Sequence, residues 1–162
     1  MRTIIHSEPE RIAETIMACD ICFVAMADTD GTPYVLPMNF GFRDGIVYLH
    51  SGREGRKLRI LERNPQVCLS FCSARRLVYQ HPDVACSYSM SAESVIAHGS
   101  VVFEEDYDKK VEALRIIMSH YSEKTFDFNP PAVRNVQIWL VSLENMSCKT
   151  KEFGVSSKSS PR

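Results

Sequence analysis

Arg53, Arg56 and Lys57 place three positive charges close together, directly after Ser51. Ser51 and Glu54 have the spacing of a capping box, which predicts that a helix begins at this point. The start of a helix offers N–H groups without partners and a partial positive charge, and both attract an anion. The sequence therefore predicts a phosphate or carboxylate site here. The alternative is a solvated basic face, because lysine and arginine side chains are mostly exposed.

His50 comes immediately before this basic cluster. A histidine ring has an unperturbed pKa near 6.5, so it can donate or accept a proton close to neutral pH. The alternative is a histidine at the end of a strand that only hydrogen-bonds a neighbouring loop. His50 is therefore a candidate catalytic residue, with a structural role left open.

The six cysteines include two closely spaced pairs, Cys19-x-x-Cys22 and Cys68-x-x-x-Cys72. Cys22, Cys68 and Cys72 lie in apolar runs, where cysteine behaves as a small hydrophobic residue. The second pair lacks zinc-ribbon spacing, and no nearby histidine completes a tetrahedral set of ligands. We expect reduced thiols and no metal site, with a cysteine-bound zinc as the alternative.

The elements that position these residues are mostly strands. A short β-branched and aromatic run, residues 46–50, leads into the basic helix, which Asn64-Pro65 ends. Further strands are predicted at residues 21–27, 34–42, 66–71, 94–103 and 135–143, with less certain pieces at 76–80 and 86–90. Helices are predicted at residues 8–18 and 107–121, and a loop at 126–133. Six or seven strands with hairpin spacing and two or three helices predict a small β-barrel with helices packed outside it.

The strand predicted at residues 34–42 alternates with a period of two. Its bulky side chains, at Tyr34, Leu36, Met38, Phe40 and Phe42, point to one face. Pro37 cannot donate to a sheet ladder, so this strand lies at an edge or is interrupted there. Backbone groups near Pro37 are then free to bind a ligand, or simply mark an edge strand.

Two other segments carry specific expectations. Gly99, inside the strand at 94–103, predicts a bulge or a close backbone approach. In the helix at 107–121, an apolar stripe is expected to face the core or another subunit. This stripe comprises Tyr107, Val111, Leu114, Met118 and Tyr121.

Length and composition limit the possible classes of protein. The chain has 162 residues, 44% hydrophobic and 24% charged, which suits one globular domain. A net charge of −1 gives no general attraction to nucleic acid or to an anionic membrane. No stretch reaches the roughly twenty apolar residues of a membrane span, and the N-terminus does not resemble a signal peptide. We expect a cytoplasmic protein whose residues 1–152 form the domain and whose residues 153–162 are a disordered tail.

Several motifs in this order resemble the pyridoxamine 5′-phosphate oxidase-like split-barrel flavoproteins, and most closely their nitroimidazole-resistance branch. They are Pro33-Tyr-Val-Leu-Pro-Met-Asn-Phe-Gly41, His50-Ser-Gly-Arg-Glu-Gly-Arg-Lys57, Asn64-Pro-Gln-Val-Cys68, Glu93-Ser-Val-Ile96, Phe126-Asp-Phe-Asn129 and Glu144-Asn-Met-Ser-Cys-Lys-Thr150. The resemblance implies a split β-barrel that binds FMN as a homodimer, with the flavins at the subunit interface.

The same resemblance implies roles for individual residues. Ser51, Arg56 and Lys57 would hold the FMN phosphate, and His50 would lie beside the flavin as the functional residue. The remaining cofactor contacts would be Val35, Leu36, Pro37, Met38 and Asn39 along the flavin ring, Ser94 as a polar contact, and Trp139 reaching in from the partner subunit. The arginine-rich substrate set of true pyridoxamine phosphate oxidases is not evident, which argues against vitamin B6 oxidation.

The most concrete hypothesis is an FMN-dependent oxidoreductase that reduces a small aromatic substrate of the nitro type. The alternative is a non-catalytic carrier or sensor that binds flavin or heme on the same barrel. Three histidines, His50, His98 and His120, keep heme ligation open.

Overall fold

The structure of the protein is a computed structural model that describes residues 2–152, with side chains described except at residues 2, 3, 74, 75 and 145–152. The tail predicted at 153–162 lies outside the described residues. Within the described range, no helix is long and apolar enough to cross a membrane.

Seven strands form one continuous antiparallel path, in the order β3-β2-β6-β7-β8-β5-β4. β1 and β9 pair with each other, and β9 also pairs with β7. The strands are β1 (Arg2–His6), β2 (Cys22–Ala27), β3 (Pro33–Met38), β4 (Gly41–Arg43), β5 (Ile46–Gly52), β6 (Gln66–Val78), β7 (Ser89–Glu104), β8 (Val136–Ser142) and β9 (Glu144–Glu152). The seven-stranded path agrees with the predicted barrel, and β1 and β9 add to it.

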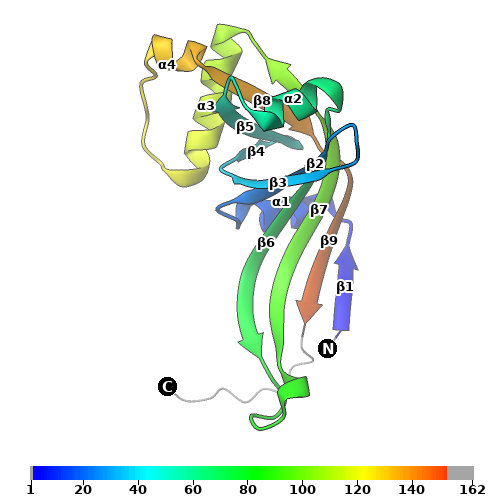
Figure 1. Ribbon diagram of the computed structural model, residues 1–162. Coiled ribbons are helices and arrows are strands. Elements are labelled where there is room, and N and C mark those ends of the chain that lie inside the picture. The colour runs from blue at the N-terminus through cyan, green and yellow to red at the C-terminus, as the bar shows by residue number, and fades with distance from the viewer. Residues whose placement is uncertain (1, 153–162) are drawn as a thin grey trace.

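The sheet curls into a split barrel because β7 is shared by its two parts (Figure 1). Residues 89–100 of β7 pair with β6, and residues 101–104 pair with β8. Gly99 lies at this change of partner, where a Cβ atom would stand 2.5 Å from the carbonyl oxygen of Ser142. The expected close backbone approach at Gly99 is confirmed. Beyond the barrel, β6, β7, β9 and β1 run together as a long arm.

The helices are α1 (Pro9–Met17), α2 (Arg56–Arg63), α3 (Tyr107–Tyr121) and α4 (Pro130–Arg134), and a 3₁₀ turn, η1, spans Ala85–Ser87. α1 packs on β6 and β7, and α3 packs on β4 and β5. The buried core joins these layers, and its largest fully buried side chains include Trp139, Phe40, Phe71, Ile16 and Leu49.

Three sequence predictions are corrected by the structure. The loop expected at 126–133 contains α4, because Asn129-Pro130-Pro131 places prolines at the first positions of a short helix, where a missing N–H has no consequence. The strand expected at 34–42 divides into β3 and β4 around Asn39 and Phe40. Neither β1 nor β9 was predicted, since each depends on pairing with a distant segment.

The apolar stripe predicted on α3 is not the side that packs on the core, and its alternative contact with another subunit stays a prediction. The buried residues are Lys110, Ala113, Ile116 and Ile117, whereas Tyr121 is 37% exposed. Lys110 can face inward because its ammonium group donates to Glu105 Oε2 at 3.2 Å and to the carbonyl oxygen of Val136 at 3.1 Å. Satisfying a buried charge in this way lets a lysine take a core position.

Candidate functional site

The basic helix α2 begins later than the sequence predicts. Ser51 is still part of β5, whose pairing with β8 continues through Ser51 and Gly52. Its hydroxyl donates to the carbonyl oxygen of Gly52 at 2.8 Å and caps no helix. The residue before the helix is Gly55, whose φ of 122° is one that side chains rarely adopt. The predicted capping box is therefore wrong, because the sheet ladder extends past Ser51.

The start of α2 nevertheless has the properties of an anion site. No side chain caps it, and the first backbone hydrogen bond of the helix runs from the N–H of Arg59 to the carbonyl oxygen of Gly55. The N–H groups of Arg56, Lys57 and Leu58 thus have no hydrogen-bond partner among the described residues. Neither Arg56 nor Lys57 forms an ion pair within the same part of the chain. Free N–H groups and two cations outside any ion pair favour an anion at this point.

Arg53 does not join this pair of cations. Its guanidinium group donates to the carboxylate of Glu105 at 3.3–3.4 Å and to the carbonyl oxygen of Arg134 at 3.4 Å. Glu105 also accepts hydrogen bonds from Gln137 Nε2 at 3.0 Å and from Lys110 Nζ at 3.2 Å. The hydrogen bond from Gln137, followed by those from Lys110 and Arg53, lowers the pKa of Glu105. This network ties the turn before α2 to β7, α3 and β8.

The edge strand β3 lies close to the start of α2. The guanidinium carbon of Arg56 stands 5.2 Å from the centre of the Tyr34 ring, a cation–π contact. β3 pairs only with β2 among the described strands, so the expected edge position of Pro37 is confirmed. Of the residues predicted to contact a cofactor along this segment, Val35, Pro37 and Asn39 are exposed.

The two other residues predicted on this segment are less accessible. Leu36 is half-buried against the core, and Met38 is only 9% exposed within it. Their side chains point to the buried face of β3, so they are poorly placed to contact a ligand on its exposed face. Their backbone groups remain at the edge strand.

His50 lies on β5, opposite Ile138 of β8 and two residues before the end of the strand. Its side chain is exposed, yet desolvation by the protein around it lowers the pKa of the imidazole below its usual value. The ring is therefore mainly neutral at neutral pH. A neutral ring carries one N–H donor and one acceptor nitrogen, so it can hold or pass a proton.

Ser94 and Trp139 occupy very different environments. Ser94 is half-buried on β7. It lies on the same face of the sheet as Pro37, because residues paired across neighbouring strands point to the same face, as do residues two apart on one strand. The path runs through the pairs Pro37–Phe23, Phe23–Ser70 and Ser70–Ile96, and Ile96 is two residues from Ser94. Trp139 is fully buried in the core of its own chain, where Phe103 packs edge-on against it at 6.3 Å.

The burial of Trp139 removes it from the residues that can meet a cofactor held by another subunit. Its indole N–H finds no hydrogen-bond partner among the described residues. The sequence could not reveal this, because an apolar strand with one tryptophan suits either an exposed or a buried face.

The structure thus gathers Arg56, Lys57 and the β3 edge at one corner, with His50 on the strand that leads into it. Sequence reasoning missed Tyr34 and Glu105 as supporting residues. Tyr34 carried a weak signal as an aromatic residue on the edge strand. Glu105 carried none, since its partners lie up to 52 residues away along the chain.

The histidines and cysteines whose side chains the structure describes do not form a set of metal ligands. Among the described residues, no group of three histidine, cysteine, aspartate or glutamate side chains is placed to hold a metal ion. Cys19 and Cys22 are buried, and their thiols donate to the carbonyl oxygens of Thr15 and Met38. His120 is engaged in the fold through a 2.7 Å hydrogen bond between Nε2 and the carbonyl oxygen of Cys19.

The family of this chain follows from comparison with known proteins. The family model described as pyridoxamine 5′-phosphate oxidase matches residues 8–148, which is most of the chain. The chain belongs to the pyridoxamine 5′-phosphate oxidase family. The resemblance seen in the sequence is confirmed. A search of curated proteins found no match.

Several solved structures share the fold. A proposed 5-nitroimidazole antibiotic resistance protein from Bacteroides thetaiotaomicron is 46% identical, with a TM-score of 0.83 over 92% of this chain and 87% of the other. Two more distant structures show the fold alone. One is the flavocytochrome Anf3 from Azotobacter vinelandii, which is 22% identical, with a TM-score of 0.79 over 92% of this chain and 70% of the other. The other is an FAD- and heme-binding protein from Mycobacterium smegmatis, which is 17% identical, with a TM-score of 0.81 over 92% of this chain and 74% of the other.

Proposed function

We propose that this protein is an FMN-dependent oxidoreductase that reduces a small aromatic substrate of the nitro type. The observation that carries the proposal is the uncapped start of α2, where free N–H groups meet two cations that form no ion pair with any described carboxylate. This arrangement suits the phosphate of FMN. The similarity to a proposed 5-nitroimidazole resistance protein supports the substrate class.

The residues present fit an FMN phosphate at this corner. Lys57, a half-buried residue, would bind it with its ammonium group and Arg56 with its guanidinium group, while the backbone N–H groups of the first turn donate to the same oxygens. The flavin ring would extend along Val35 and Pro37 at the exposed edge of β3. FMN, when bound, supplies the hydride transfer that the side chains cannot perform.

His50 would serve as the proton donor or acceptor beside the cofactor. Its lowered pKa keeps it neutral near pH 7, so its N–H can donate to a substrate oxygen and its other nitrogen can take up a proton. Its position on β5, two residues before the turn into α2, keeps it on the same strand as the phosphate corner.

We also propose that the protein works as a homodimer. The outer face of β2 and β3 leaves Phe23 49% exposed and Val35 61% exposed. On the arm, the paired residues Leu77 and Met90 are 60% and 45% exposed. A second copy covering this face would remove apolar surface from water and enclose a flavin between the subunits.

The proposal is tested by the visible spectrum of the purified protein and by titration of the flavin-free protein with FMN and riboflavin. We expect a flavin spectrum, and tighter binding of FMN than of riboflavin, which lacks the phosphate. Chemically reduced protein should then be reoxidised by a nitroimidazole.

Each step of this test has an opposing outcome. Failure to bind either flavin contradicts the cofactor, and equal affinity for the two flavins removes the phosphate site. A bound flavin that no nitroaromatic compound reoxidises would favour the non-catalytic carrier. Light scattering that gives a monomer mass would contradict the dimer.

A further inference from the structure

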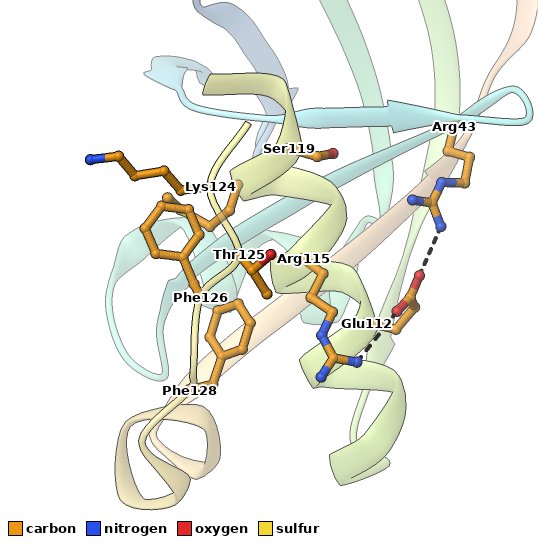
Figure 2. A pocket seen from close by; sticks show the side chains of 9 residues that line it. Arg43, Glu112, Arg115, Ser119, Lys124, Thr125, Phe126 and Phe128 are labelled. Atoms are coloured by element: carbon orange, nitrogen blue, oxygen red, sulfur yellow. Dashed lines mark hydrogen bonds and ion pairs between the residues drawn. The ribbon is translucent and has the colours of Figure 1, made fainter. Parts of the chain in front are cut away.

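A cavity of about 250 Å³ lies between the outer side of α3 and the loop that follows this helix (Figure 2). The side of α3 that packs on the barrel carries Ala113, Ile116 and Ile117, so the cavity is on the opposite side of the helix. No residue of α2 lines it, and it is separate from the proposed flavin corner.

One wall of the cavity is aromatic. Phe126 and Phe128 are half-buried, while Asp127 between them is exposed. This alternation is that of an extended segment, whose every second side chain points the same way. Both residues line the cavity from the loop beside α3 (Figure 2). Met118 of α3 adds apolar surface to the lining. Aromatic walls of this kind favour a planar ring by stacking and edge contacts.

The rim of the cavity is basic. Arg43 Nη1 donates to Glu112 Oε1 at 2.8 Å, whereas Arg115 Nη1 stands 3.9 Å from Glu112 Oε2, which is too far for a hydrogen bond. The Arg115 guanidinium and the Lys124 ammonium group make no hydrogen bond to any described residue. Three cations thus face one carboxylate, in a chain whose net charge is −1.

A neighbouring recess limits where an anion can lie. It shares Arg115, Phe126 and Phe128 with the cavity, but Asp108 and Asp127 line it as well. These two carboxylates repel an anion on that side of Arg115. Negative charge is therefore favoured on the side of the larger cavity, where Arg43, Arg115 and Lys124 outnumber the single carboxylate of Glu112.

We propose that this cavity binds a single-ring aromatic carboxylate. The ring packs against Phe126 and Phe128, and the carboxylate accepts hydrogen bonds from the guanidinium group of Arg115, whose planar fork matches its geometry. The volume is below the range of about 300–1,000 Å³ that is typical of sites for drug-sized ligands, which agrees with a one-ring compound. This site is independent of flavin binding.

The test is a titration of the protein as purified, carrying any chromophore it holds, with benzoate, benzamide and terephthalate, followed by NMR of backbone amides. We expect saturable shifts confined to residues 112–128 with benzoate. Benzamide, which lacks the charge, should bind at least about tenfold more weakly, because a hydrogen bond to a charged group is lost. Terephthalate should also bind more weakly, because its second carboxylate meets Asp108 or Asp127.

Two variants locate the site, and a third is the matched control. Arg115→Ala and Phe128→Ala should each weaken benzoate binding about tenfold or more, while Arg63→Ala, at an exposed arginine on α2, should leave it unchanged. Thermal unfolding verifies that all three variants are folded. Absence of saturable shifts, equal binding of benzamide, or unchanged affinity in Arg115→Ala would overturn the proposal.

Discussion

Replacing Lys57 with alanine tests the phosphate corner most directly. Lys57 is half-buried at the start of α2, and its ammonium group has no ion-pair partner in the described part of the chain. The substitution removes this charge but keeps the backbone N–H groups of the first helical turn. A charge-assisted hydrogen bond contributes roughly 1.5–3 kcal/mol, so the Kd for FMN should rise about 10- to 100-fold.

The comparison with riboflavin makes this prediction specific. Riboflavin has the same ring system without the phosphate, so its Kd should be the same in the wild type and in Lys57→Ala. Arg63→Ala is the control for general charge, because Arg63 is exposed at the other end of the same helix. Fluorescence quenching of each flavin gives the constants. An equal loss of FMN and riboflavin affinity would show that Lys57 supports the fold, and an unchanged FMN affinity would place the phosphate elsewhere.

Four further outcomes are expected. His50→Gln should keep flavin affinity but slow reoxidation by a nitroimidazole about 100-fold or more in single-turnover measurements. Because the folded pKa of His50 is lowered, the free energy of unfolding should fall as the pH drops below about 6.5 toward that pKa, and His50→Gln should flatten this part of a urea-denaturation profile. Glu105→Gln removes the carboxylate that pairs with the buried Lys110 and with Arg53, so it should cost about 1–3 kcal/mol of stability and, by releasing Arg53 next to the anion site, strengthen FMN binding relative to riboflavin binding. Gly99→Ala should cost about 1–3 kcal/mol through the clash of its Cβ with the neighbouring strand, whereas Gly52→Ala, with no atom within 4 Å, should change stability little.

In the Glu105 variant, a change in the ratio of FMN affinity to riboflavin affinity distinguishes an effect on the phosphate site from a general loss of stability. If Glu105→Gln lowers the melting temperature while the ratio of FMN to riboflavin affinity stays constant, the network around Glu105 is purely structural. In the same way, a melting temperature of Gly99→Ala equal to that of the wild type would contradict the close approach of β7 to β8.

The sequence by itself determined the features that rest on local signals. The alternation at residues 34–42, with Pro37 as an edge marker, predicted β3 and its position at the edge of the sheet, because a proline without an N–H is excluded from the middle of a ladder. The boundaries of α3 matched the predicted range of 107–121, since Asp106 caps the helix by accepting from the N–H of Lys109. The cluster of Arg56 and Lys57 at a helix start was also local, and it survived the shift of the helix boundary.

Only the tertiary structure decided which of these residues can act together. Because β5 pairs with β8 through Gly52, α2 begins at Arg56 and not at the predicted Ser51. Arg53 binds the carboxylate of Glu105 and therefore does not contribute to the anion site. Trp139, expected to reach a flavin, is fully buried in its own core. Each of these outcomes depends on contacts between segments far apart in the chain, and no pattern of neighbouring residues specifies such contacts.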